Sequence, residues 1–432
     1  MGTETKPQYS PGLAGVIAGE TAICWVDPAA GLMYRGYDIH QMAGKATFEE
    51  VAYLLLNGEL PNAKQLKDFT QQIAGETAIC WVDPAAGLMY RGYDIHGMAE
   101  KATFEEVAYL LLNRELPNAK QLKDFTEQIA SERGLPGPVT EMLRLLPSDT
   151  HPMDMLRTGV SMLSAFDKDL GDNSHDANIR KSIRLIARVS TLITDGWRIS
   201  QGEQPFPEKP ELTQAANFFY KFNGKIPEQW QTRMLDTIFN LYADHEYNAS
   251  TFAARVTAST LAGIYAAVTS AVATLKGPLH GGANEESMKM LEEIGTPDRA
   301  EVWLMKKLGA KDKIMGFGHR VYKEGDSRVP AMREIGRDLG KRTGKEHWVP
   351  ICEKLEEVMD REKQLCANVD LYAAPVFWML GFPPELNTPL FAASRVAGWC
   401  AHVIEQHDNN RLIRPRSLYV GPELRPYPGS PG

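Results

Sequence analysis

The chain has 432 residues, of which 43% are hydrophobic and 24% are charged, and its formal net charge is -8. A chain of this length can bury one large core or two, so we expect a globular enzyme with two domains. The acidic balance leaves no basic surplus for a phosphate backbone, which excludes nucleic acid as an expected partner.

The sequence predicts no membrane-spanning helix. The longest mostly apolar stretch, Leu261 to Leu275, is shorter than the about 20 residues that a bilayer span needs, and we expect a buried core helix there. Met1 to Pro11 lack a basic region followed by an apolar run, which predicts no signal peptide and a cytoplasmic location. The five cysteines form no C-x-x-C pair, so we expect reduced thiols without disulfides or zinc.

The N-terminal part of the chain contains a tandem repeat. Ile17 to Gln72 and Ile73 to Gln128 are identical at 52 of 56 positions and differ only at 41/97, 44/100, 58/114 and 71/127. Solenoids stack about three or more units with divergent ends, so two nearly identical copies indicate a recent duplication. We expect the working fold to need one copy, and deletion of either copy to preserve the site.

The sequence leaves open which copy packs on the rest of the chain. Gly58 follows an apolar helix in the first copy and suits a left-handed C-cap, whereas Arg114 takes this position in the second copy. The second copy, however, continues directly into the body of the chain. Local conformation therefore favours the first copy, and connectivity favours the second.

Helical spacing of apolar residues dominates the chain after the repeat. Within each copy, two short β-rich runs flank the turn DPAAG, which predicts a small hairpin. The fold class is therefore expected to be all-α with a small N-terminal hairpin that is duplicated in tandem. The expected helices are Phe48 to Asn57, Met153 to Phe166, Ile179 to Ile193, Gln229 to Tyr242, Phe252 to Leu275, Arg299 to Leu308 and Pro389 to Glu405.

A histidine stands on a glycine-rich turn in the segment Gly277 to Glu285 (GPLHGGANE), just before a helix expected to begin near Ala283. Glycines allow a ligand to approach the backbone closely. A helix N-terminus disfavours the imidazolium form, so His280 would stay neutral and donate a hydrogen bond to a developing enolate. The alternative is a turn histidine that only caps backbone groups.

The segment Lys311 to Lys323 (KDKIMGFGHRVYK) is a Gly-x-Gly loop with several positive side chains. Its backbone N–H groups and lysines are suited to holding phosphates. It is not a dinucleotide fingerprint, because the third glycine and the preceding strand are missing. The alternative is a solvated basic loop.

Four further residues in this part of the chain are candidates for catalysis or for substrate binding. Asp370 enters an apolar stretch, where partial desolvation would make a general base, although an ordinary helix N-cap is the alternative. Arg328, Arg395 and Arg414 have guanidinium forks that match carboxylates, so together they would bind a dicarboxylate. Taken singly, each of the three arginines is typical of a surface or an interface.

Taken together, these segments resemble the citrate synthase family. The strings GPLHGGANE from Gly277, MGFGHRVY from Met315 and NVD from Asn368 occur in the order and spacing of that family. The likeness extends from Gly12 to the RPRS string at Arg414 and resembles the shorter bacterial and archaeal form. Only the duplicated segment departs from the family pattern.

The resemblance implies a citrate synthase of the tricarboxylic acid cycle, an acyltransferase that converts the acyl group to alkyl on transfer (class EC 2.3.3). Asp370 would remove the α-proton of acetyl-CoA, His280 would stabilise the enol or enolate, and His319 would protonate the ketone oxygen of oxaloacetate. Citryl-CoA would then be hydrolysed to citrate and CoA. The resemblance implies oxaloacetate binding by His245, Arg328, Arg395 and Arg414, and CoA binding by Asp312, Lys313, Ile314, Met315, Gly316 and Lys323.

The family fold further implies a homodimer of two-domain helical subunits. Residues 1–276 and 378–432 would form the large domain, and residues 277–377 would form a small CoA-binding domain that closes over the substrate and excludes water. Arg414 would enter the site of the partner subunit. Oxaloacetate and the acyl-CoA are the expected small-molecule partners, and neither a permanently bound cofactor nor a metal is expected.

Three other functions were weighed against this one. A 2-methylcitrate synthase resembles the chain in the same motifs and uses propionyl-CoA, and one methylene changes selectivity only about 10- to 200-fold, so the motifs do not decide. A catalytically inactive binding protein of the same fold is the alternative from another class. A metalloenzyme lacks support, since no His-Glu-x-x-His spacing occurs, and a serine hydrolase is excluded because no G-x-S-x-G string occurs.

Overall fold

The computed structural model describes residues 77–83, 87–318, 322 and 325–414, together with 24–27, 31–34, 37–38, 42, 46, 50–51, 54–55 and 59–65. The chain divides into two compact units, Met1–Glu76 and Thr77–Gly432. The first copy of the repeat therefore belongs to one unit, and the second copy from Thr77 onward belongs to the other. Two predicted site residues, His319 and Lys323, lie outside the described residues.

Each copy of the repeat contains a three-stranded antiparallel sheet. In the first unit the order is β1 (Cys24–Asp27), β2 (Gly31–Tyr34) and β3 (Tyr37–Asp38). In the second unit β4 (Cys80–Asp83), β5 (Gly87–Tyr90) and β6 (Tyr93–Asp94) repeat that order. The register is also the same, with Cys24 opposite Tyr34 and Cys80 opposite Tyr90.

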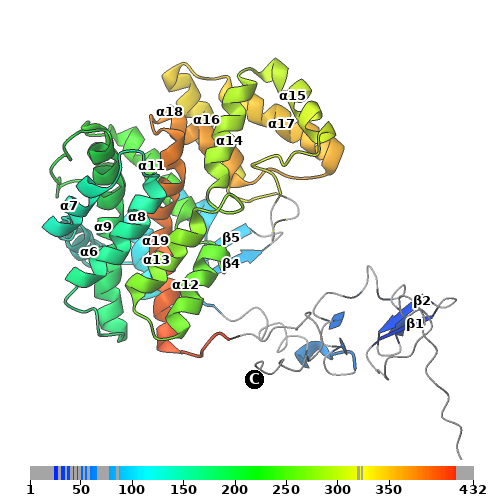
Figure 1. The fold of residues 1–432 in the computed structure, drawn as a ribbon, viewed down its shortest axis with the longest axis horizontal. Coiled ribbons are helices and arrows are strands. Elements are labelled where there is room, and N and C mark those ends of the chain that lie inside the picture. Colours follow the sequence, from blue (N-terminus) through cyan, green and yellow to red (C-terminus); the bar gives the residue numbers. More distant parts are fainter. Residues whose placement is uncertain are drawn as a thin grey trace, which may run out of the picture. The chain divides into compact units, whose positions relative to one another are not determined.

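Helices form most of the second unit (Figure 1). In its described part, no helix is long and apolar enough to cross a membrane. The helices before Gly277 are α4 (Ile95–Ala99), α5 (Phe104–Asn113), α6 (Ala119–Ser131), α7 (Gly137–Leu145), α8 (Pro152–Leu163), the 3-10 turn η2 (Ser164–Phe166), α9 (His175–Ser200), α10 (Gln214–Asn223), α11 (Gln229–Tyr242), α12 (Ala249–Ser259) and α13 (Ile264–Leu275). The later ones are α14 (Ala283–Ile294), α15 (Pro297–Gly309), α16 (Val329–Thr343), α17 (Trp348–Lys363), α18 (Val369–Met379), η3 (Pro384–Leu386) and α19 (Asn387–Asp408).

Helix α19 lies at the centre of the core. Every residue from Asn387 to Ile404 is buried, because α5, α9, α12 and α13 pack around the helix. Polar side chains on such a helix need internal partners. The Trp399 indole donates to Ser250 Oγ at 3.2 Å, for example. This central position is what buries Arg395.

Helices α14 to α18 lie together on one side of the second unit (Figure 1). Helix α14 packs on α18, α16 packs on α18, and α15 packs on α17. Helix α18 also packs on the 3-10 turn η3, which leads into α19. The group falls close to the range 277–377 that the sequence suggests for a small domain, and the boundaries themselves remain a prediction.

The helix expected from Phe252 to Leu275 is wrong as a single element. Helix α12 ends at Ser259 and α13 begins at Ile264. Leu261 adopts a φ of 64° between them, and Gly263 is the N-cap of α13. The apolar spacing continues across this break, so periodicity alone missed it. The helix expected from Gln229 to Tyr242 is confirmed as α11.

The second copy of the repeat packs into the helical body although its helix ends in a strained cap. Arg114 follows α5 in the left-handed conformation, with a φ of 73°. A residue with a Cβ pays roughly 1 to 2 kcal/mol there. The Phe104 ring contacts Phe239 edge to face at 5.2 Å, and Glu105 accepts the N–H of Gln214 at 2.7 Å. Burial and buried hydrogen bonds hold this copy in place despite the cap.

Candidate active site

A tight turn places His280 between α13 and α14. The His280 N–H donates to the Gly277 carbonyl at 2.9 Å, and the Gly282 N–H donates to the same oxygen at 3.2 Å. A Cβ on Gly281 would lie 2.8 Å from the Leu275 carbonyl oxygen, and one on Gly282 would lie 2.7 Å from that of Lys276. Only glycine fits at these two positions, so the turn requires the two glycines that follow His280.

The surroundings of His280 keep its imidazole neutral. The N–H of Ser250, in the first turn of α12, donates to His280 Nε2 at 3.3 Å, and Ser250 Oγ lies 2.8 Å from the same atom. A backbone N–H can only donate, so Nε2 accepts and the ring proton resides on Nδ1. Burial lowers the pKa of His280 to about 4, with a further contribution from the charge of Arg395. His280 is therefore a neutral hydrogen-bond donor through Nδ1.

Asp370 lies in the first turn of α18 but is not its N-cap. Asn368 is the cap, and its Oδ1 accepts the Asp370 N–H at 3.1 Å, so the N-cap alternative for Asp370 is wrong. Burial raises the pKa of Asp370 to about 6, and Arg328 opposes this rise. Asn284 Nδ2 donates to Asp370 Oδ1 at 3.3 Å and also favours the charged form. A carboxylate with these neighbours is ionised at neutral pH and basic enough to take a proton.

Arg395 on α19 is a buried cation next to both of these groups. Its side chain is 1% exposed, its Nε donates to the Tyr242 carbonyl at 2.6 Å, and its guanidinium lies 4.6 Å from the centre of the Phe391 ring. Its Nη2 is buried and has no hydrogen-bond partner among the described residues. The charge of Arg395 lowers the pKa of both His280 and Asp370, which places it within electrostatic reach of each.

Arg328 is buried as well, but its guanidinium already forms a bidentate ion pair with Asp326. Its Nε and Nη2 donate to Asp326 Oδ1 and Oδ2 at 2.9 and 2.7 Å. Asp326 Oδ2 also accepts the Val369 N–H at 3.0 Å, which ties the pair to the start of α18. The guanidinium lies 5.8 Å from the centre of the Tyr242 ring. A substrate carboxylate at Arg328 would have to share the cation with Asp326.

His245 is buried beside this group of residues. Its ring contacts Tyr322 edge to face at 5.6 Å, and the Tyr322 hydroxyl lies 2.9 Å from Ser327 Oγ. Ser327 stands between Asp326 and Arg328 in the chain. The structure therefore connects His245 to Arg328 through two contacts. The Phe391 ring lies between the Arg395 guanidinium and the His280 ring, at 4.6 Å from the first and 6.3 Å from the second.

The predicted CoA loop is anchored to the start of α18. Asp312 and Lys313 are exposed, whereas Ile314 and Gly316 are buried. Gly316 has a φ of 80°, and a Cβ there would lie 2.9 Å from the Cβ of Leu371. The Gly316 carbonyl accepts the N–H of Asn368 at 2.9 Å. The glycine is thus required for the loop to approach the helix that carries Asp370.

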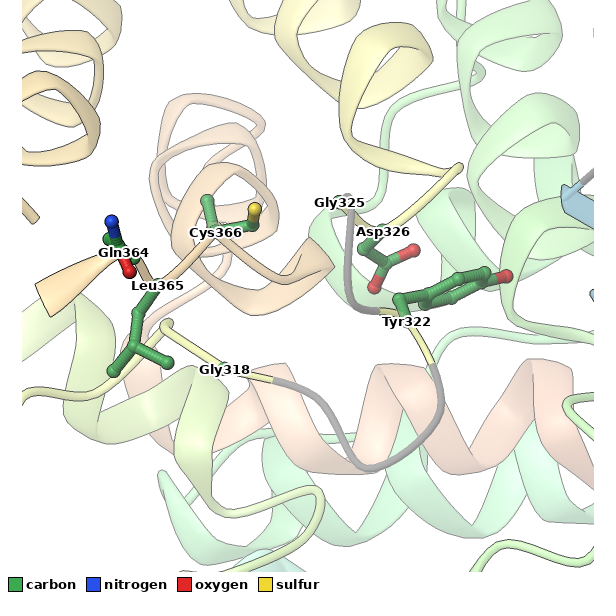
Figure 2. Close-up of a pocket in the computed structure, with 8 residues that line it drawn as sticks. Gly318, Tyr322, Gly325, Asp326, Gln364, Leu365 and Cys366 are labelled. Atoms are coloured by element: carbon green, nitrogen blue, oxygen red, sulfur yellow. The ribbon is translucent and has the colours of Figure 1, made fainter. Parts of the chain in front are cut away.

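A cavity of about 240 Å³ opens beside this loop (Figure 2). Its lining includes Tyr322 and Asp326 on one side, and Leu365 and Cys366 on the other. Two of its lining residues are joined through the backbone, because the Gly318 N–H donates to the Cys366 carbonyl at 2.9 Å. The cavity lies next to the Asp326 partner of Arg328.

Among the described residues, the structure does not bring Arg414 to the other predicted site residues. It is exposed at the end of the described chain. Sequence reasoning missed four residues that the structure adds: Asn284, Tyr242, Tyr322 and Asp326. Two of them could have been found from the sequence. Asn284 belongs to the GPLHGGANE string, and Asp326 precedes Arg328 by two residues.

Comparison with known proteins identifies the family. The family model described as citrate synthase, C-terminal domain, matches residues 12–76 and 70–416. Citrate synthase 2 of Bacillus subtilis (strain 168) is 45% identical over 341 residues, which are 79% of this chain and 92% of that protein. The citrate/2-methylcitrate synthase of the same organism is 44% identical over 355 residues, which are 82% of this chain and 95% of that protein.

A solved structure shares the fold. The ternary complex of citrate synthase from the thermophilic archaeon Thermoplasma acidophilum with carboxymethyl coenzyme A and oxaloacetate has a TM-score of 0.77 and 32% identity. The match covers 83% of this chain and 97% of that one. Sequence and fold agree, and the chain belongs to the citrate synthase family of acyltransferases.

Proposed function

We propose that the chain is a citrate synthase that condenses acetyl-CoA with oxaloacetate and hydrolyses citryl-CoA to citrate and CoA. The observation that carries this proposal is the position of Arg395, whose guanidinium lies 4.6 Å from the centre of the Phe391 ring, which the His280 ring contacts at 6.3 Å. Its Nε donates to the Tyr242 carbonyl, and Asn284 Nδ2 donates to both the Tyr242 hydroxyl and Asp370. A base and an enolate stabiliser are thus gathered around a group that binds carboxylates. Relatives named citrate synthase support the reaction.

Asp370 acts as the general base in this proposal. A thioester α-proton is far too weak an acid for a solvated carboxylate, so the base must be partly desolvated and must act together with an enolate stabiliser. Burial supplies the first condition by raising the pKa of Asp370 to about 6. The Asn284 amide fixes the orientation of the carboxylate.

His280 is the enolate stabiliser that must act together with this base. Its Nε2 is occupied by the Ser250 N–H and hydroxyl, so Nδ1–H is available to donate to the thioester oxygen as negative charge develops there. A neutral donor suits the role, because an imidazolium would protonate the enolate fully and would be costly to bury. The hydrogen bond from α12 favours the tautomer that this role needs.

Oxaloacetate binds at the arginines in this account. Arg395 offers its buried Nη2 to one carboxylate, and Arg328 and His245 contact the rest of the molecule. Arg414 of a second copy of the chain completes the pocket in a homodimer, and His319 protonates the ketone oxygen as the new carbon–carbon bond forms. The solved complex of a relative with oxaloacetate and a CoA analogue supports this pairing of substrates.

CoA binds along the anchored loop. Asp312, Lys313, Ile314, Met315 and Gly316 would hold the adenine and pyrophosphate, with Lys323 as a further phosphate partner. The cavity beside Tyr322 and Leu365 is the open volume next to that loop. Residues 277–377 act as a small domain that closes on the large domain once both substrates are bound, and no resident cofactor takes part.

The second candidate is a 2-methylcitrate synthase that uses propionyl-CoA. A relative with 44% identity is named citrate/2-methylcitrate synthase, so this family includes a member with both names. The two thioesters differ by one methylene, and a pocket distinguishes such pairs only about 10- to 200-fold. The same residues would carry both reactions.

One experiment decides between these functions. CoA release is followed with oxaloacetate and either acetyl-CoA or propionyl-CoA, and kcat/KM is determined for each. A higher value with acetyl-CoA supports the citrate synthase, and a higher value with propionyl-CoA supports the 2-methylcitrate synthase. No release with either thioester, while oxaloacetate still binds, would overturn both and support an inactive binding protein.

A further inference from the structure

The hairpin of the second copy reaches the backbone next to His245. The Tyr90 side chain is fully buried, and its hydroxyl oxygen lies 3.0 Å from the Asn240 carbonyl oxygen and 2.9 Å from that of Asp244. The same hydroxyl accepts the Asp244 N–H at 3.1 Å. One side chain of β5 therefore fixes the end of α11 to the residue before His245.

The hairpin holds the backbone of Asp244, because the Tyr90 hydroxyl accepts its N–H. The carboxylate of Asp244 faces His402, whose Nε2 lies 3.1 Å from its Oδ2. Both Asp244 and His402 are fully buried. Asp244 is also a Coulombic partner of Arg395. The hairpin thus holds the counter-charge of the buried arginine as well as the backbone of His245.

The turn end of the hairpin contacts the other arginine region. A Cβ on Gly87 would lie 3.3 Å from the Cβ of Ser327, so the backbone of β5 packs directly on Ser327. Ser327 precedes Arg328, and its Oγ lies 2.9 Å from the Tyr322 hydroxyl. Gly87 also has a φ of 95°, which a residue with a side chain adopts only with strain.

We propose that the β4–β5 hairpin of the second copy is a positioning element of the oxaloacetate pocket. It acts through Asp244 on His245 and Arg395, and through Ser327 on Arg328. The inference rests on the proposed function and adds Tyr90 to it as a positioning residue, which does not touch substrate. The first copy carries the same hairpin sequence in the other unit, and the second copy is the one that serves the pocket.

The duplication supplies a matched control, because Tyr34 is the counterpart of Tyr90. Tyr90→Phe in the full-length chain removes three hydrogen-bond contacts and keeps the ring. We expect the dissociation constant of oxaloacetate, measured by calorimetry, and its KM to rise about tenfold. The kcat at saturating oxaloacetate should change less than about twofold, and Tyr34→Phe should match the unchanged protein.

The results separate this inference from the proposed function. Loss of thermal stability in Tyr90→Phe with an unchanged dissociation constant would overturn the inference, since the hairpin would then be structural only. A weakened affinity in Tyr34→Phe in place of Tyr90→Phe would overturn the assignment to the second copy. An unaltered chain that binds oxaloacetate without releasing CoA would overturn the proposed function alone, because calorimetry needs no turnover.

Discussion

The amide of Asn284 donates a hydrogen bond to the carboxylate of Asp370, with Nδ2 3.3 Å from Oδ1. The two residues belong to α14 and α18, which pack on each other. The helix that follows His280 thus also orients the proposed base. The N-terminal end of α14 therefore helps to position both His280 and Asp370, the two residues proposed for the enolisation step.

Replacement of Asn284 by alanine should shift the pH profile of turnover. The amide favours the carboxylate, so its loss raises the pKa of Asp370 above the value of about 6 in the unaltered protein. A base works only when deprotonated, so the acid limb of kcat moves to higher pH. The ratio of kcat at pH 6 to kcat at pH 8 should fall roughly twofold, as a rise of half a pH unit from about 6 implies. An unmoved acid limb would contradict the role of this hydrogen bond.

Replacement of Arg395 by methionine should lower stability as well as binding. It leaves the buried Asp244 carboxylate without the charge of Arg395, so the free energy of unfolding should fall by about 3 to 5 kcal/mol. The dissociation constant of oxaloacetate should rise by about 100-fold or more because a charge-assisted bond is lost. Arg157→Met, at a partly exposed arginine on α8, serves as the control. Retained affinity in Arg395→Met would remove this residue from the pocket.

Replacement of Arg114 by glycine should stabilise the second unit. Its φ of 73° is accessible to glycine without a steric penalty, and the gain should be about 0.5 to 1 kcal/mol. Arg114→Ala is the control, because it also removes the exposed ion pair with Asp408 but keeps the Cβ. Thermal melting should show a gain with glycine only. An equal gain in thermal stability with alanine would show that the effect comes from loss of the arginine side chain and not from relief of backbone strain.

Replacement of Asp236 by asparagine should change the pH dependence of stability. Burial raises the pKa of Asp236 to about 7, with nearby Glu105 adding to the rise. A carboxyl whose folded pKa exceeds its unfolded value loses stability as pH rises from the unfolded value of about 4 to the folded value. Asparagine carries no such penalty, so the variant should be more stable at pH 8 by up to about 4 kcal/mol.

Urea unfolding between pH 5 and pH 8 measures this effect of Asp236. The gap in unfolding free energy between Asp236→Asn and the unaltered protein should widen from pH 5 to about pH 7 and level off toward pH 8. The Phe104 N–H that Asp236 accepts at 3.2 Å can bond to the amide oxygen in the variant. A gap that stays constant across this range would show that the carboxyl does not titrate as the structure implies.

The catalytic turn could be predicted because its constraints are local. A Cβ at Gly281 or Gly282 would lie too close to a carbonyl oxygen a few residues away. The two glycines in the sequence therefore indicate the conformation of the turn. The gathering of Arg395 with His280 and Asp370 could be inferred only from family resemblance. It depends on the packing of α19 against distant helices, which leaves no signal in local spacing.

Other features could not be read locally at all. The bidentate Asp326 partner of Arg328 is close in sequence, yet a charged pair two residues apart is ordinary in any loop. The choice between the two copies depends on burial of Phe104 and Tyr90 against residues far along the chain. Both copies carry the same apolar pattern, so the pattern could not decide.

The most direct test of the central claim compares the unaltered protein with Asp370→Asn in CoA release and in oxaloacetate binding. The account predicts that turnover falls about 10²- to 10⁴-fold in the variant because the general base is lost. The dissociation constant of oxaloacetate should stay within about threefold, because Arg395 and Arg328 remain in place. Turnover that persists at the level of the unaltered protein would contradict the assignment of Asp370 and, with it, the proposed mechanism.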